Sequence, residues 1–284
     1  MIDQVYKAFI LLSPDTPRDE IIKVQRRLME YLIQPGVLEK PGPLIGAKVY
    51  ELIAEAIGEK DPYKALKEKY NRIALEHYDK VKEIVDNAED PIFEAIAVSA
   101  IGNTIDFGAH HKIDLLNDIK KFTPDNLMIN DIPKLKESLK NTNWILILGD
   151  NAGEIVFDKL LINTLQKSYP ELEIIYSVRA GPVINDSTME DAIFVGLDQV
   201  VKIIEAPAAP GIEFEIASEE LKSYFSRTDG IILTKGQGNF ESLYKKNFPN
   251  KEVYYLLKSK CVLMERIFEV EHGALIFKKK SQDF

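Results

Sequence analysis

The pattern of apolar and polar positions changes near residue 122. Before that point, apolar residues recur at spacings of three and four, which is typical of helices with one buried face. The segment 62–88 shows this best, with an apolar stripe made of Leu66, Tyr70, Ile73, Ala74, Val81, Ile84 and Val85. We therefore expect residues 1–122 to form a helical subdomain.

After residue 122, short apolar runs alternate with helical patterns. Six runs predict strands, at residues 144–148, 173–178, 200–204, 230–233, 253–257 and 274–277. Such alternation is typical of βαβ units, which build a mainly parallel sheet covered by helices. The sequence therefore predicts an α/β protein whose Rossmann-like domain, at 126–284, has helices on both faces of its sheet. We expect the helical subdomain to pack over one end of that sheet.

Composition restricts the function. The formal net charge of −9 argues against binding of long nucleic acids, which are usually met by basic surfaces. It still allows small phosphate esters, because a metal ion and a few lysines could balance their charge locally. The single cysteine, Cys261, excludes an internal disulfide and fits a reducing compartment.

The sequence predicts a cytoplasmic protein without membrane contact. No apolar run approaches the ~20 residues that span a bilayer. The first residues lack the basic start and apolar centre of a signal peptide. The oligomeric state does not follow from the sequence.

The stretch from Gly149 to Glu154 directly follows the apolar run 144–148. It contains Asp150 and Asn151 and precedes a helical pattern. In open α/β sheets, ligands bind in the crevice at the carboxyl ends of the strands. Both side chains offer oxygen and neither offers positive charge, so the pair suits a hard cation better than a bare phosphate. The alternative is that Asp150 or Asn151 only caps the following helix.

A second predicted strand also ends in a polar loop. The run 173–178 is followed by Arg179 and then by Asp186, where the next helical pattern begins. Carboxylates from two successive strand ends could close on one metal ion. The alternative is again a helix cap, formed by Asp186 or by Ser187.

Two further strand ends carry lysines. The run 230–233 leads into Lys235-Gly236-Gln237-Gly238-Asn239-Phe240-Glu241, whose glycines let backbone amides approach an anion while its lysine adds charge. This loop lacks both the Gly-Lys-Ser/Thr ending of a Walker loop and the third glycine of a dinucleotide fingerprint. The run 253–257 leads to Lys258 and Lys260. Either lysine could meet a phosphoryl group or be an ordinary solvated side chain.

Polar residues also interrupt the last part of the helical region. Asn103 and Asp106 lie three positions apart among apolar neighbours, so they either satisfy buried helix ends or reach into a site. The adjacent pair His110-His111 makes a poor zinc signature, because no cysteine or third histidine is near it. We expect these histidines to be exposed or structural.

Taken together, these segments resemble the metal-dependent damage-control phosphatase family, in particular its microbial branch. That family is also described as acidic-residue-methyltransferase-like and was formerly a domain of unknown function. The resemblance covers nearly the whole chain, and ordered blocks are far more specific than any one motif. The blocks are Asp61-Pro62-Tyr63, Asn71-Arg72-Ile73-Ala74-Leu75, Gly102-Asn103-Thr104-Ile105-Asp106-Phe107-Gly108, Gly149-Asp150-Asn151-Ala152-Gly153-Glu154, Asn185-Asp186-Ser187-Thr188, Lys235-Gly236-Gln237-Gly238-Asn239-Phe240-Glu241 and Lys260-Cys261.

The resemblance implies a set of functional residues. A divalent ion is expected on Asp150, Asn151 and Asp186, and Lys260 is expected to contact the substrate phosphate. Asp150 and Lys260 are therefore the expected catalytic residues. The expected substrate-binding residues are Asn103, Arg179, Lys235, Gly236, Gly238, Asn239 and Glu241. Microbial members often carry a Cys-x-x-Cys pair near the amino terminus, and no role of that pair is carried over because Cys261 is the only cysteine.

The ligand set also predicts which ion is preferred. Mg²⁺ loses its water reluctantly and wants near-ideal octahedral geometry. With so few protein ligands, later first-row ions should bind more tightly, so Mn²⁺, Co²⁺ or Ni²⁺ is favoured and Mg²⁺ stays possible.

The implied activity is hydrolysis of small phosphomonoesters, such as damaged or surplus nucleotides, sugar phosphates or cofactor precursors. The partner is then a small phosphorylated metabolite. Metal-activated water is favoured over a carboxylate nucleophile, since Ala152 occupies the second acidic position of haloacid-dehalogenase phosphatases. One alternative is a carboxyl methyltransferase, for which Gly153 alone is thin support. The other is a non-catalytic nucleotide-binding module.

Overall fold

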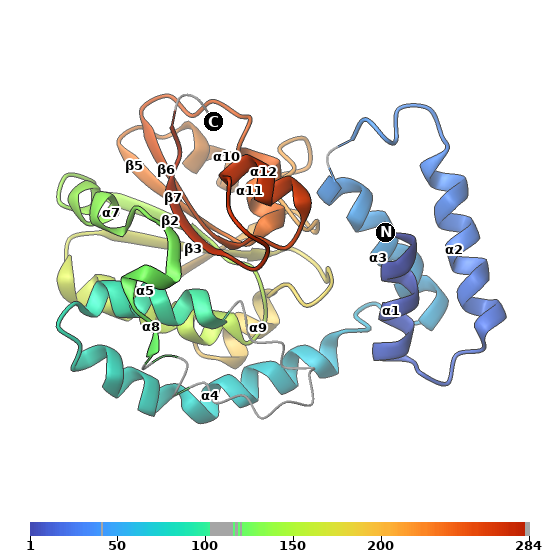
Figure 1. The fold of residues 1–284 in the computed structure, drawn as a ribbon, viewed down its shortest axis with the longest axis horizontal. Helices are drawn as coiled ribbons and strands as arrows, with labels where there is room; N and C mark the ends of the chain where they lie inside the picture. Colours follow the sequence, from blue (N-terminus) through green and yellow to red (C-terminus); the bar gives the residue numbers. More distant parts are fainter. Residues whose placement is uncertain (41, 103–115, 117–118, 120, 282–284) are drawn as a thin grey trace.

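A seven-stranded sheet forms the centre of the protein (Figure 1). The computed structural model describes residues 1–40, 42–102, 116, 119 and 121–281. The spatial order of the strands is β1-β7-β6-β5-β2-β3-β4, and β2 to β6 run parallel to one another. The strands are β1 (Leu127–Asn130), β2 (Trp144–Leu148), β3 (Glu173–Arg179), β4 (Lys202–Ala206), β5 (Gly230–Lys235), β6 (Lys251–Lys258) and β7 (Leu275–Lys279).

The six predicted strands are all present, with ends that shift by up to two residues. The sequence did not predict β1, a short edge strand that pairs with β7. These two strands run opposite to the rest, because β7 pairs antiparallel with β6 and parallel with β1. The sheet is therefore mainly parallel, as expected.

Helices cover both faces of the sheet, as the alternating pattern predicted. Every residue of β2 is buried, because successive side chains enter opposite layers. Ile145 and Ile147 pack into one layer, while Trp144, Leu146 and Leu148 pack into the other. The first layer contains α4 (Lys64–Asp86), α5 (Pro91–Gly102), α7 (Ile132–Leu139), α8 (Glu154–Ser168) and α9 (Met189–Phe194). The second contains α10 (Glu219–Ser226), α11 (Gln237–Leu243) and α12 (Val262–Phe268).

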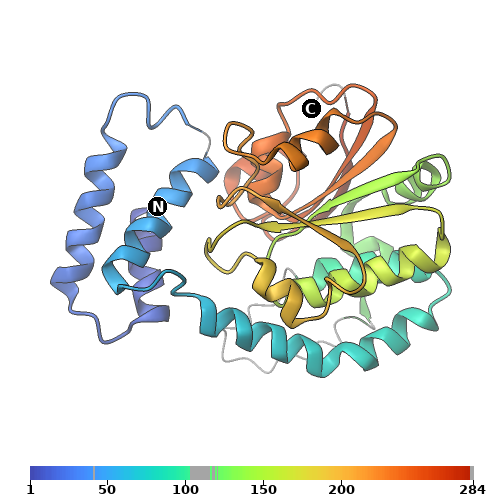
Figure 2. The ribbon, with the colours of Figure 1, turned by 180° about the vertical axis from the view of Figure 1, so that it is seen from behind.

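The first three helices have a hydrophobic cluster of their own. They are α1 (Ile2–Leu12), α2 (Arg18–Leu32) and α3 (Gly42–Ile57), and both ribbon views show them to one side of the sheet (Figures 1 and 2). The helices α4 and α5 instead share a cluster with the sheet. The described helices of the region predicted for residues 1–122 therefore belong to two different hydrophobic clusters. No helix in the described part of the chain is long and apolar enough to cross a membrane.

Close packing at the centre of the sheet gives a test of the fold. A Cβ atom on Gly230, the first residue of β5, would overlap the indole ring of Trp144. Overpacking of a buried position costs typically about 1–3 kcal/mol. We therefore expect Gly230→Ala to lower the free energy of unfolding by about that amount, as measured by urea denaturation.

The matched control for Gly230→Ala is Gly46→Ala in α3. A Cβ atom on Gly46 would lie 3.5 Å from Cγ of Pro210, an ordinary van der Waals distance. Because alanine favours helix over glycine by up to ~1 kcal/mol, this variant should be neutral or more stable. Equal losses of stability in both variants would contradict the packing of β2 against β5.

Candidate active site

The segments that follow β2, β3, β4 and β5 meet at the carboxyl edge of the sheet. Strand β2 lies between β3 and β5. After β2, the chain adds β3 and β4 on one side of it, and then returns to add β5 and β6 on the other side. Such a reversal of strand order creates a crevice at the strand ends, where ligands bind in open α/β sheets. The Asp150-Asn151 pair follows β2 and therefore lies at that reversal point.

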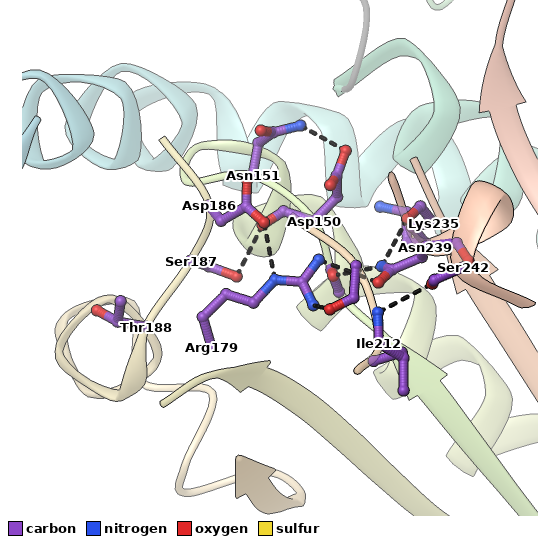
Figure 3. Close-up of polar contacts among 12 residues, drawn as sticks. Asp150, Asn151, Arg179, Asp186, Ser187, Thr188, Ile212, Lys235, Asn239 and Ser242 are labelled. Carbon is purple, nitrogen blue, oxygen red and sulfur yellow. Dashed lines mark hydrogen bonds and ion pairs between the residues drawn. The ribbon is translucent and has the colours of Figure 1, made fainter. Parts of the chain in front are cut away.

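The three predicted metal ligands lie together (Figure 3). The backbones of Asn151 and Asp186 form a β-bridge, and the Ser187 N–H donates to the Asp150 carbonyl at 2.8 Å. The Asn151 side-chain amide donates to Oδ2 of Asp150 at 2.7 Å. Two loops from neighbouring strands thus present two carboxylates and one amide at the same place.

A buried arginine fixes the loop of Asp186. Arg179 ends β3, and its Nε donates to Oδ2 of Asp186 at 2.7 Å. Its other two nitrogens donate to the Gly211 carbonyl at 3.3 Å and to Oδ1 of Asn239 at 3.0 Å. The Asn239 amide in turn donates to the carbonyls of Gly149 and Lys235. Arg179 and Asn239, both predicted substrate contacts, therefore join the loops after β2, β3, β4 and β5.

The position of Asp186 affects its charge. Burial raises the pKa of the Asp186 carboxyl to about 7, although the Arg179 guanidinium opposes this shift. The negative charge of Asp150 raises that pKa further. Two carboxylates that lie close together and are partly removed from water favour binding of a cation, because the cation would offset their repulsion.

The glycines of the loop after β5 leave space for neighbouring protein groups. Gly236 has a φ of +78°, and a Cβ atom on it would overlap the Asp150 carboxylate. Its N–H donates to the Leu256 carbonyl at 3.0 Å, so this amide is used within the sheet. A Cβ atom on Gly238 would overlap the carbonyl of Pro210. Both glycines therefore admit neighbouring protein groups, and Gly236 lets the Asp150 side chain lie against the backbone.

Lys235 does not line the crevice. Its side chain is fully buried, and its ammonium group pairs with the carboxylates of Glu154 and Asp158 on α8. Asp158 also accepts hydrogen bonds from Ser99 and Tyr176, both at 2.7 Å. Position 235 shares the sheet face of Ile231 and Leu233, which packs against α8. The charge predicted to meet a substrate is thus balanced inside the protein.

The remaining predicted residues lie in several places. Lys260 is exposed and follows β6, beside Cys261, whose sulfur accepts a hydrogen bond from Gln237 at 3.2 Å. Gln237 also donates to Glu241 at 2.6 Å, and this carboxylate lies near Gly42 at the start of α3. Asn103 lies outside the described residues, as do Asp106 and the histidine pair. Among these residues only Lys260 thus presents a positive charge at the sheet edge.

Sequence reasoning missed a support behind the Asp150 loop. Asn71 of α4 accepts a hydrogen bond from the Gly153 N–H at 2.7 Å and donates to Asp191 at 2.8 Å. Lys67, one turn earlier, pairs with both Asp191 and Asp61. The signals were the polar residues beside the apolar stripe of α4 and the family blocks that contain Asp61 and Asn71. Neither showed the contact with Asp191, which lies about 120 residues away in the sequence.

The donor set fits an ion held by few protein ligands. Within the described residues, no three His, Cys, Asp or Glu side chains form a group that could hold a metal ion. The set of Asp150, Asn151 and Asp186 is outside that definition, because it contains only two carboxylates and its third member is an asparagine. Oxygen ligands of this type suit a hard divalent ion that keeps several waters.

The buried lysine gives a test of the wall behind the site. Lys235→Met would leave Glu154 and Asp158 as buried carboxylates without their cation. Removing one partner of a buried ion pair costs about 3–5 kcal/mol, so we expect a loss of stability of that size in urea denaturation. The control is Lys258→Met, because Lys258 is only partly buried. Equal stability of the two variants would contradict the burial of Lys235.

Comparison with known proteins identifies the family of the chain. A family model of the damage-control phosphatase ARMT1-like domain matches residues 1–276. A damage-control phosphatase of Pyrococcus horikoshii is 33% identical over 265 residues, covering 92% of this chain and 88% of that protein. A damage-control phosphatase of Archaeoglobus fulgidus is 30% identical over 240 residues, covering 82% and 81%. An uncharacterised protein of Methanocaldococcus jannaschii is 35% identical over 243 residues, covering 83% and 79%.

A solved structure extends the likeness to the fold. The crystal structure of a DUF89 family protein from Pyrococcus horikoshii superposes with a TM-score of 0.81 at 27% identity, covering 99% of this chain and 96% of that one. The family resemblance drawn from the sequence blocks is thereby confirmed. The chain belongs to the family of damage-control phosphatases with an ARMT1-like domain.

Proposed function

We propose that this protein is a metal-dependent phosphomonoesterase that acts on small phosphorylated metabolites. The observation that carries the proposal is the meeting of Asp150, Asn151 and Asp186 at the reversal point of the sheet. The names of the two damage-control phosphatases among its relatives support the reaction class.

The chemistry supplied by a divalent ion at this place is the polarisation of the phosphoryl group and the activation of water. Asp150 and Asp186 would hold the ion through carboxylate oxygens, and Asn151 through its amide oxygen. The Asn151 amide nitrogen donates to Oδ2 of Asp150, so the amide oxygen is the atom that would bind the ion. Mn²⁺, Co²⁺ or Ni²⁺ remains our preferred ion, with Mg²⁺ as a possible substitute.

The protein groups around the ion have separate tasks. Arg179 holds the Asp186 carboxylate in one orientation, and Gly236 gives Asp150 its place beside the loop after β5. Lys260, exposed after the neighbouring strand β6, would offset the charge of the phosphoryl oxygens. Asp150 and Lys260 are thus the proposed catalytic pair.

The carboxyl methyltransferase alternative has less support from the geometry. A methyl-donor cofactor would need glycines that leave open space after the first parallel strand. Instead, a Cβ atom on Gly149 would overlap the Tyr176 hydroxyl, and the Gly153 N–H donates to Asn71. The Tyr176 hydroxyl thus fills the space beside Gly149, and the Gly153 amide is used within the protein.

Removal of the metal gives the first test of this proposal. Dialysis against excess EDTA should abolish phosphate release from phenyl phosphate, because the proposed ligands offer no cation to replace the ion. Adding back each ion at equal concentration should restore activity better with Mn²⁺, Co²⁺ or Ni²⁺ than with Mg²⁺. Full activity in the chelated protein would refute the metal dependence. Recovery with Mg²⁺ alone would refute the preference among ions.

Replacement of Asp150 gives the second test. Asp150→Asn keeps the size of the side chain but removes the charge that would face the ion. We expect loss of bound Mn²⁺, measured by atomic absorption after gel filtration, and a fall in kcat of at least roughly 100-fold. The melting temperature should change little, because Asp150 is only partly buried.

The control for Asp150→Asn is the same change at Asp198, which is exposed and lies after α9. Asp198→Asn should keep the metal content and kcat of the unaltered protein. A metal content that is unchanged in Asp150→Asn would remove Asp150 from the ligand set. Asp186 is a poorer first target, because its loss would leave the Arg179 guanidinium buried without its carboxylate.

A further inference from the structure

A cavity of about 570 Å³ lies beside the proposed metal site. One wall comes from α3 and the turn after it, and the opposite wall from the loop between β3 and α9. The second wall includes Val183 and Ile184. The Asp186 N–H donates to the Val183 carbonyl at 2.9 Å, so this wall and a proposed metal ligand belong to one tight turn.

The helix α3 lies along the edge of the sheet that carries the site. Residues four apart on one of its faces contact successive loops: Gly42 lies near Glu241 of α11, and Gly46 lies near Pro210 in the loop after β4. The next residue on this face is Tyr50, which lines the cavity. Val49 and Leu52 of α3 pack against α1 and α2, and Ile53 belongs to the same cluster while it also lines the cavity.

Two tyrosines form the aromatic part of the cavity lining. The rings of Tyr50 and Tyr63 meet edge to face, with centroids 6.1 Å apart. Burial raises the pKa of the Tyr50 hydroxyl well above its usual value, and the charge of Asp186 contributes to that shift. Tyr50 therefore stays uncharged at neutral pH.

The opposite wall contains a strained residue. Ile184 has a φ of +47°, a left-handed conformation that a β-branched side chain rarely adopts. Strain of this kind persists only where the surrounding structure enforces it, and it occurs most often at functional sites. Here it belongs to the turn that leads into Asp186, and Ile184 lines the cavity across from α3.

The charges around the cavity restrict what it could hold. Its lining includes four carboxylates and one lysine, Lys60. Three of the carboxylates are paired, as Glu51 with Lys48, Glu55 with Arg27 and Asp61 with Lys67. The fourth belongs to Glu59. With one lysine against four carboxylates, most of them already paired, the lining offers a negatively charged ligand group little net attraction, whereas an uncharged ring would meet apolar and aromatic side chains.

We propose that this cavity is the leaving-group subsite of the enzyme, which takes a flat, uncharged ring of the phosphomonoester between Tyr50 and Ile184. The proposal rests on the phosphatase function proposed above. The phosphate would lie at Asp150 and Asp186, and the ring would extend beneath α3. Specificity for the alcohol part of the substrate would then come from α3 together with the loop between β3 and α9.

Binding of phosphonates tests the subsite without turnover. The full chain with Mn²⁺ would be titrated by calorimetry with benzylphosphonate, ethylphosphonate and 4-carboxybenzylphosphonate. Burying the ring should make benzylphosphonate bind about tenfold more tightly than ethylphosphonate, or more. The carboxylate on the third compound should remove most of that gain. Equal affinities of the unaltered protein for all three compounds would overturn the proposal.

Three variants locate the ring. Tyr50→Ala and Ile184→Gly should each reduce the affinity ratio of benzylphosphonate to ethylphosphonate to less than about threefold. Ile184→Gly should do so without lowering the melting temperature, because glycine relieves the positive φ. The matched control is Tyr31→Ala, since Tyr31 packs against the same three-helix cluster as Tyr50 but does not line the cavity. It should keep the ratio, and a ratio kept in all three variants would overturn the proposal.

Phosphate release from benzyl phosphate and ethyl phosphate, measured in parallel, separates the two proposals. Release from both esters without any preference in binding would refute the subsite alone. A ring preference that depends on Tyr50 and Ile184, without release from either ester, would support the subsite and refute the phosphatase function.

Discussion

The buried ion pair of Arg179 and Asp186 is the interaction on which the site depends. One guanidinium contacts a carboxylate after β3, a carbonyl after β4 and an amide oxygen after β5. Asn239 continues this network to the carbonyl of Gly149 at the end of β2. Because a buried charge is costly without its partner, this network resists separation of the loops. The protein itself therefore places Asp150 and Asp186 near each other before any ligand binds.

Much of the fold could be predicted because buried parallel strands are continuous apolar runs. Each residue of β2 is buried, and its bounds agree with the predicted run. The strand β1 gave no such signal, since only Leu127 among its four residues is buried. The pattern also did not show that α4 and α5 pack on the sheet while α1 to α3 form a separate cluster. All five are amphipathic or apolar helices, and periodicity does not identify the surface that a helix covers.

The meeting of Asp150 and Asp186 was predictable, but the contacts of the residues around them were less so. Carboxyl ends of neighbouring parallel strands must meet, which brings Asp150 and Asp186 together. The role of Lys235 depended on partners that lie on another element, namely Glu154 and Asp158 of α8. Gly236 was expected to approach a phosphate, yet the same lack of a side chain admits the Asp150 carboxylate. The residue type at each position showed which interactions it could make. The packing of elements distant in the sequence determined which of these it makes.

Charges in the walls of the site give an independent reason for a cation there. Among the described residues, three buried cations, Lys67, Arg179 and Lys235, are paired with carboxylates of the protein. Their partners are Asp61, Asp191, Asp186, Glu154 and Asp158, so carboxylates outnumber these cations even before Asp150 is considered. Burial and this excess of negative charge raise the pKa of Glu154, although Lys235 opposes the shift. A phosphomonoester would add negative charge to the same place. On the proposed function, a metal ion together with exposed groups such as Lys260 would offset that charge, because each buried cation is already paired with carboxylates of the walls.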